Sequence, residues 1–224
     1  MTVQQFNEIF ELAANRHGGP ESLEQKLSKP ASTAQLTSIA DDRWLSGVSK
    51  SIFQAGFVWR VVENKWPDFE TAFDNFDLVH CAYLSDEEIE AFTNDTRVIR
   101  HLKKLQSIRA NATYLLEKTT EFGGVGNFIT SYGPTHYCEL LFELKKNASR
   151  LGGTSAQYCL RRMGVDSFIL SRDVVKALQR ANIITKAANS KRDILNIQSA
   201  FNYWHEHSGR TLTEMSRVLA LSVD

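Results

Sequence analysis

Glycines and hydroxyl side chains follow one another in Leu151-Gly152-Gly153-Thr154-Ser155, the segment best suited to hold an anion. Gly152 and Gly153 predict a tight turn, because glycine accepts a positive φ and lets a phosphate approach the backbone. The free N–H groups at the start of the next helix, with its positive dipole end, bind anions, and Thr154 and Ser155 add hydroxyl donors. An ordinary turn between two helices with a glycine C-cap would also account for the glycines, and this alternative stays open.

Basic residues surround this turn, although the chain as a whole has a formal net charge of zero. Between Leu141 and Arg192 there are eleven Lys or Arg residues and three acidic ones, which gives the segment a charge of +8. A surface facing a polyanion would produce this pattern, and so would charges scattered over solvated helices. For the first case we expect Lys145, Lys146 and Arg150 to attract the phosphate backbone without reading sequence.

A second group of candidate residues lies on an aromatic helix upstream. Apolar residues recur there at spacings of four, four, three and four, which predicts one buried stripe on a helix that starts near Asp41 or Asp42. The stripe residues are Trp44, Val48, Ile52, Ala55 and Trp59. Gly56 is expected to break or kink this helix, and Trp66-Pro67 to end the segment.

Helices are expected throughout, because apolar residues recur at three and four rather than alternating. A Ser/Thr-rich linker is expected at 29–39 and a glycine linker at 123–126. The remaining expected helices are 3–16, a short one opened by a capping box at 22–25, 86–92 opened by a box at Ser85, 98–118, 136–148, 155–163, 171–181, 193–205 and one opened by a box at 211–214. The fold class predicted is all-α.

Cysteine usage and the chain start limit the compartment. Cys81, Cys138 and Cys159 are an odd number without a CxxC pair, so neither disulfides nor a structural zinc site is indicated. No signal peptide or membrane-spanning run is found, and a cytoplasmic protein that needs no metal and no cofactor is expected.

Several segments together resemble the DNA-3-methyladenine glycosylase I family of the helix-hairpin-helix DNA glycosylases, over roughly 41–179. They are Asp41-Asp42-Arg43-Trp44-Leu45, Phe53-Gln54-Ala55-Gly56-Phe57-Val58-Trp59, Asn64-Lys65-Trp66-Pro67, Ile108-Arg109-Ala110-Asn111-Ala112, Leu151-Gly152-Gly153-Thr154-Ser155 and Phe168-Ile169-Leu170. The resemblance implies a two-lobed helical fold with a cleft for a flipped-out alkylated adenine.

The resemblance also implies base-binding residues, namely Trp59, Gln54, Phe53, Ser51 and Trp44. The ring of Trp59 would stack on the extruded base, since a cationic, electron-poor purine gains from an aromatic face. A place for Trp59 in the core, as part of its stripe, is the alternative.

Three positions depart from the family pattern. Ser51 stands where the family pocket has a glutamate, and Asp173 stands where its late zinc-binding histidine would be, so we expect no zinc. Ser171 occupies the place of the superfamily's catalytic aspartate. Asp173, two positions later, is the best remaining candidate for the catalytic carboxylate, although Ser171 and Asp173 equally suit the N-terminal cap of a helix.

The functional prediction is a monofunctional glycosylase that removes alkylated purines such as 3-methyladenine from double-stranded DNA in base-excision repair, acting as a monomer. A catalytically inactive DNA-binding protein on the same scaffold is the alternative, and a structural helical protein without a nucleic-acid partner is a third. Residues 1–39 are expected to form an N-terminal extension, and 40–224 a glycosylase-like domain with its hairpin at 136–163.

Overall fold

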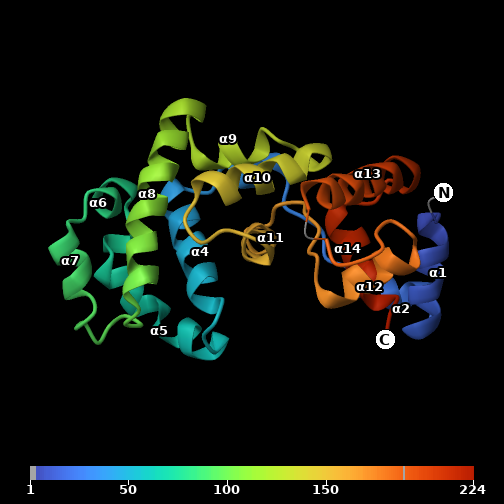
Figure 1. Cartoon of the computed structure of the whole chain (residues 1–224), viewed down its shortest axis with the longest axis horizontal. Helices are drawn as coiled ribbons and strands as arrows, with labels where there is room; N and C mark the ends of the chain where they lie inside the picture. Colours follow the sequence, from blue (N-terminus) through green and yellow to red (C-terminus); the bar gives the residue numbers. More distant parts are fainter. Residues whose placement is uncertain (1–3, 189) are drawn as a thin grey trace. The chain divides into compact units, whose positions relative to one another are not determined.

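A computed structural model describes residues 4–188 and 190–224, and within these ranges every regular element is a helix (Figure 1). The helices are α1 Phe6–Arg16, α2 Pro20–Glu24, α3 Thr33–Thr37, α4 Asp41–Gln54, α5 Trp59–Ala72, η1 Asp74–Phe76, α6 Leu78–Ala82, α7 Asp86–Ala91, α8 Leu102–Phe122, α9 Val125–Thr130, η2 Pro134–His136, α10 Tyr137–Asn147, α11 Thr154–Arg162, α12 Arg172–Arg180, α13 Lys191–Ser208 and α14 Leu212–Leu221. The all-α prediction is confirmed. No helix among these residues combines the length and apolar character needed to cross a membrane.

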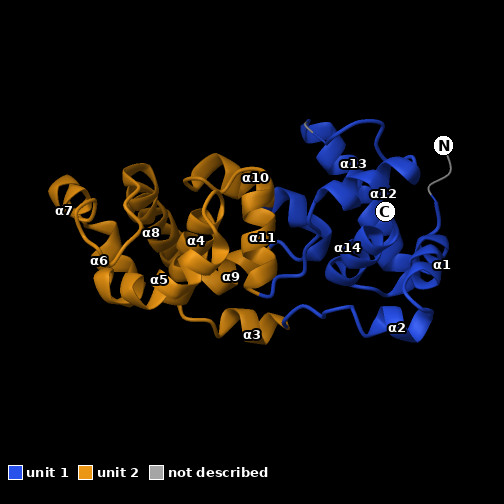
Figure 2. Cartoon of the chain, turned by 90° about the horizontal axis from the view of Figure 1, so that it is seen from below, with its two compact units in different colours: residues 1–31, 132–140, 164–224 blue, residues 32–131, 141–163 orange. Residues whose placement is uncertain are grey.

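The chain divides into two compact units, which Figure 2 shows in different colours. Unit 1 comprises residues 1–31, 132–140 and 164–224, and unit 2 comprises residues 32–131 and 141–163. The helices at the N-terminus therefore group with those at the C-terminus, and the boundary expected after residue 39 does not coincide with a boundary between units, which falls after Ala31.

Unit 2 is built around α8, which contacts α4, α6, α7 and α9. The start of α4 is tied to the far end of α8 and to α9 by Asp41. Its carboxylate accepts hydrogen bonds from the Thr119 hydroxyl at 2.6 Å and from the backbone N–H of Val125 at 2.8 Å. Asp41 thus caps α9, whose own preceding residue, Gly124, offers no side chain for this purpose.

The turn between α10 and α11 is fixed to α8 by the buried side chain of Asn111. The Asn111 amide donates to the carbonyl oxygen of Ser149 at 3.1 Å and accepts from the Ser149 N–H at 2.7 Å. Both ends of the amide are used on one residue, so the hairpin is held in register against α8.

Unit 1 packs α12 and α1 against α14, which also contacts α13. Capping boxes begin α13 at Ser190 and α14 at Thr211, and a third capping box begins α7 of unit 2 at Ser85. The boxes predicted at Ser85 and Thr211 are confirmed. Asp166 adds a second cap to α14 by accepting from the backbone N–H groups of Leu212 and Thr213, so this helix is anchored at its start.

Four local expectations are wrong. The 22–25 box does not form, because α2 begins earlier, at Pro20 after Gly19. Both expected linkers contain helix: Ser32 and Gln35 form a capping box for α3, and 125–130 is α9. Pro67 lies inside α5 rather than at its end. A proline inside a helix costs a backbone hydrogen bond. Here the buried rings of Trp66 and Phe69, on either side of Pro67, stack with centroids 4.8 Å apart, and this packing favours continuation of the helix.

Candidate base-binding hollow

The segment between α4 and α5 carries the residues on which the family resemblance depends. α4 ends at Gln54, Gly56 takes a φ of 111°, and α5 begins at Trp59. The predicted break at Gly56 is confirmed, and it moves Trp59 out of the stripe of α4. Trp44, Val48 and Ile52 are buried, whereas the Trp59 side chain is 54% exposed, so Trp59 is not a core residue.

Lys104 of α8 holds the end of α4 in place. Its ammonium donates to the carbonyl oxygens of Ile52 at 2.8 Å, Phe53 at 3.2 Å and Ala55 at 2.8 Å. The last carbonyls of a helix lack partners within the helix and carry partial negative charge, and a cation placed there satisfies both conditions. The conformation of the turn after Gln54 is thereby fixed from outside it.

An open hollow of about 200 Å³ lies beside Trp59, here called the Trp59 hollow. α4 and the turn after it contribute Ser51, Gln54 and Ala55, and α11 contributes its first turn and the residues one and two turns later. The complete lining is Ser51, Gln54, Ala55, Trp59, Thr154, Ser155, Tyr158 and Arg162. Ser51 and Gln54 are buried, and the aromatic rings of Trp59 and Tyr158 remain accessible.

Two of the lining residues, Tyr158 and Arg162, were not singled out by the sequence, and the charged one of the two is Arg162. Its guanidinium carbon lies 4.3 Å from the centroid of the Trp59 ring and 5.8 Å from that of Tyr158. Its Nη1 donates to Gln54 Oε1 and, at 3.5 Å, to Ser51 Oγ. In the sequence Arg162 is one of eleven basic residues in the positively charged segment, and only the packing of α11 on α4 distinguishes it.

Gln54 connects Arg162 to a carboxylate outside the hollow. Gln54 Nε2 donates to Glu63 Oε1 at 2.7 Å, and the other oxygen of Glu63 forms an ion pair with Lys50 at 2.6 Å. A carboxylate on one side and a guanidinium on the other fix the orientation of the Gln54 amide. The Glu63 carboxylate contacts Lys50 and Gln54, and Glu63 does not line the hollow.

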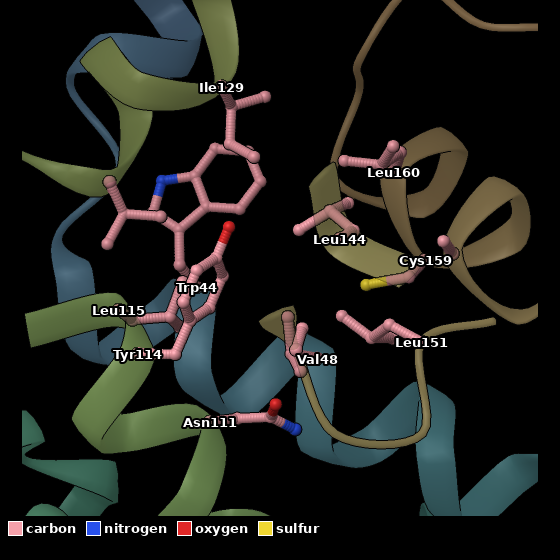
Figure 3. Close-up of a pocket in the computed structure, with 13 residues that line it drawn as sticks. Trp44, Val48, Asn111, Tyr114, Leu115, Ile129, Leu144, Leu151, Cys159 and Leu160 are labelled. Atoms are coloured by element: carbon pink, nitrogen blue, oxygen red, sulfur yellow. The ribbon is translucent and has the colours of Figure 1, made fainter. Parts of the chain in front are cut away.

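Phe53 and Trp44, both predicted to bind the base, are buried and do not line the Trp59 hollow. Phe53 packs edge-on against Phe69, with ring centroids 4.8 Å apart. Trp44 lies in the apolar interior of unit 2, opposite Leu144 and Leu160 of the hairpin helices (Figure 3). Their positions support a role in docking α4 and the hairpin, since an apolar ring on the inner face of a helix packs with its neighbours.

The predicted phosphate-binding residues lie together on the hairpin. Lys145, Lys146 and Arg150 are exposed, and a Cβ added to Gly152 or Gly153 would meet no atom within 4 Å, so the turn is open. Gly153 has a φ of 58° and precedes α11, whose first turn has no side-chain cap. Thr154 and Ser155 face the Trp59 hollow, so the hairpin contributes both to this hollow and to the open turn.

Asp173 belongs to unit 1, in the first turn of α12. Ser171 caps this helix by accepting from the backbone N–H of Val174 at 3.3 Å, and the exposed carboxylate of Asp173 lies beside that positive helix end. The catalytic role of Asp173 stays a prediction.

A zinc ion of the kind held by the family would not be accommodated by the residues present. In the part of the chain that the structure describes, no three His, Cys, Asp or Glu side chains come together as a metal site requires. Cys81, Cys138 and Cys159 are buried in separate places, and burial raises the pKa of the Cys81 and Cys138 thiols to about 12.

The sequence is similar to known proteins over part of its length. A family model described as methyladenine glycosylase matches residues 39–152. DNA-3-methyladenine glycosylase 1 of Escherichia coli (strain K12) is 32% identical over 79 residues, which are 35% of this chain and 42% of that protein. The matched part thus spans less than half of that relative.

Solved structures share the fold at lower identity. A mutant of 3-methyladenine DNA glycosylase I from Staphylococcus aureus matches with a TM-score of 0.52 and 18% identity, over 69% of this chain and 90% of that one. The 8-oxoguanine DNA glycosylase of Thermotoga maritima matches with a TM-score of 0.54 and 17% identity, over 96% and 95%. The predicted helix-hairpin-helix glycosylase fold is confirmed, and because the family model covers half of the sequence, the chain belongs to the methyladenine glycosylase family.

Proposed function

We propose that this chain is a DNA glycosylase that hydrolyses the N-glycosidic bond of alkylated purines such as 3-methyladenine in double-stranded DNA. One observation carries the proposal: the half-exposed ring of Trp59 borders an open hollow that is lined by Gln54 and Ala55 at the end of α4 and by the first turn of α11. Relatives named 3-methyladenine DNA glycosylase support the substrate class. A related fold has been solved with DNA containing 8-oxoguanine, which supports duplex DNA as the partner.

The geometry suits a base that has left the stack. A base inside a duplex cannot reach an enzyme pocket, so glycosylases extrude it and stack it on aromatic side chains. Trp59 would supply such a stacking surface, while the exposed Lys145, Lys146 and Arg150 would hold the strand by its phosphates.

The chemical step requires little from the protein if the base is already a good leaving group. No lysine lines the Trp59 hollow among the residues that the structure describes, which supports direct hydrolysis over a Schiff base on this protein. Water attacks the sugar carbon as the glycosidic bond breaks, and Asp173 stays the candidate base for that water.

The test is release of free base from methylated duplex DNA by the purified chain, alongside Trp59→Ala and Asp173→Asn. We expect release by the unchanged chain, its loss in Trp59→Ala, and slower release in Asp173→Asn, because an amide cannot accept the proton of the attacking water. Tyr83→Ala, which removes another exposed aromatic side chain outside the hollow, is the matched control and should keep full activity.

Absence of release at high protein concentration, with salt-dependent duplex binding intact, would reject the proposal and favour a DNA-binding protein without catalysis. Undetectable duplex binding would instead favour a structural protein.

A further inference from the structure

The Trp59 hollow contains a cation and no carboxylate. Its eight lining residues include Arg162 and no acidic side chain, because Ser51 stands at the position where the family resemblance places a glutamate. Arg162 forms no ion pair with any residue that the structure describes. Glu63 accepts a hydrogen bond from Gln54, but its negative charge is compensated by the ion pair with Lys50. A base entering the hollow therefore meets an unbalanced positive charge.

The guanidinium is held in a defined place while most of its donors stay available. Stacking on Trp59 and the contacts of Nη1 with Gln54 and Ser51 fix its plane. A guanidinium has five N–H donors in a rigid fork and no acceptor, and it is always charged. Thr154, Ser155 and Tyr158 add hydroxyl groups around it. The hollow is thus rich in hydrogen-bond donors, and a complementary ligand would carry hydrogen-bond acceptors along one edge of its ring.

Positive charge and donors together discriminate between two kinds of damaged purine. A purine methylated on N3 or N7 carries a positive charge while attached to the sugar, and it is repelled by Arg162. A neutral 6-oxopurine presents O6 and N7 as adjacent acceptors, the pair that an arginine fork binds in a bidentate manner. The same contact would stabilise the negative charge that a neutral base acquires as its glycosidic bond breaks.

We propose that Arg162 is a specificity-determining residue that makes the Trp59 hollow prefer neutral 6-oxopurines, of which hypoxanthine is the simplest, over cationic purines. The proposal rests on the proposed function only in taking the hollow as a base site, and it assigns a neutral purine as the preferred base in place of the cationic 3-methyladenine that the names of the relatives suggest. Water remains the co-reactant: its hydroxyl group joins the sugar carbon, and its proton ends on the departing base.

A binding experiment tests the preference without requiring catalysis. The probes are 1-methylinosine, which is a neutral 6-oxopurine nucleoside, and 1-methyladenosine, a cation of nearly the same shape. Quenching of tryptophan fluorescence reports on the hollow, because Trp59 is half-exposed whereas Trp44, Trp66 and Trp204 are buried. We expect the unchanged chain to bind 1-methylinosine roughly tenfold more tightly, the size of a good bidentate contact.

Variants of Arg162 separate charge from shape. Arg162→Gln should bring the ratio of the two dissociation constants close to one, because it weakens binding of 1-methylinosine and strengthens binding of 1-methyladenosine. Arg162→Lys should keep the poor binding of the cation but lose part of the gain for the neutral base, because an ammonium lacks the planar fork. Arg60→Gln removes an exposed charge next to Trp59 that does not line the hollow, and it should leave the ratio unchanged.

Three outcomes would overturn the proposal. If Arg162→Gln strengthens both nucleosides equally, Arg162 only occupies the face of Trp59. If Arg162→Gln weakens binding of DNA duplexes by the same factor with a damaged base as without one, Arg162 contacts a phosphate. If neither nucleoside quenches the unchanged chain, the hollow is not a base site.

Release of hypoxanthine from a duplex with one deoxyinosine, compared with 3-methyladenine from methylated DNA, extends the test to the reaction. A preference between nucleosides without release of either base would reject the glycosylase proposal and leave the role of Arg162 standing.

Discussion

Lys104 is a buried cation that stabilises a turn rather than an ion pair. It forms no ion pair among the residues described, and its three hydrogen bonds all go to carbonyl oxygens at the end of α4. Burial, with a smaller contribution from Arg150, lowers the pKa of Lys104 below its ordinary value. Its hydrogen bonds hold the backbone on both sides of Gln54.

Replacing Lys104 by methionine keeps the aliphatic length and removes the donors. Each buried carbonyl left without a partner costs about 1–3 kcal/mol, so we expect a loss of roughly 3 kcal/mol or more in the free energy of unfolding. Urea denaturation followed by circular dichroism measures the change. Lys103→Met, at the exposed neighbouring position, is the control, and an equal loss in both variants would contradict the assignment.

The three cysteines should be unreactive in the folded protein. Burial raises the pKa of Cys159 to about 11, and Ser51 and Arg162 offset only part of that rise. A raised pKa keeps a thiol protonated at neutral pH, and only the thiolate is nucleophilic. We expect a thiol reagent at mildly alkaline pH to modify none of Cys81, Cys138 and Cys159 until denaturant is added. Rapid modification of any one in the native chain would show that its surroundings open.

The sequence did not predict short helices that depend on contacts with residues far away along the chain. α9 follows two glycines and reads as a linker, yet Asp41, 84 residues away from Val125, supplies its cap. The long helices and the boxes at Ser85 and Thr211 depend on local periodicity and capping, and these were predictable. The break at Gly56 was expected as well, but the accessible position of Trp59 depends on where α5 starts after the turn.

α3 and α9 approach so closely that only glycine fits between them. A Cβ on Gly126 would lie 2.5 Å from the carbonyl oxygen of Leu36 and 2.8 Å from Cα of Thr37, both backbone atoms. Gly126→Ala should therefore lower the melting temperature by several degrees, on the scale of about 1–3 kcal/mol for an overpacked contact. Gly152→Ala, where the added methyl group meets open space, should leave it within about one degree in the same calorimetric scan.

At the scale of the molecule, a neutral chain carries its positive charge in one segment. Residues 141–192 have a net charge of +8, and the remainder has the compensating negative charge. Sequence alone could locate this asymmetry, because it needs only counting. It could not tell that Arg162 stacks on Trp59, because that contact depends on how α11 packs on α4, between residues 103 positions apart.

Duplex binding should weaken steeply as salt rises, since phosphate contacts release counterions. Lys145→Gln and Lys146→Gln should each reduce the slope of the logarithm of affinity against the logarithm of salt concentration by about one, whatever the sequence of the duplex. Fluorescence anisotropy at several salt concentrations gives the slope. Lys29→Gln, an exposed lysine outside the positively charged segment, should leave the slope as it was, and a matching decrease there would show that the attraction is not localised.

The two units are interleaved along the chain, as the colours of Figure 2 make plain. The backbone enters unit 2 twice and returns to unit 1 twice, so neither unit corresponds to one uninterrupted stretch of gene. A single recombination point placed inside 32–163 replaces parts of both units together, and neither can be exchanged as a cassette or encoded as a separate fragment. Units 1 and 2 are therefore inherited as one genetic unit, and changes in either are selected in the presence of the other.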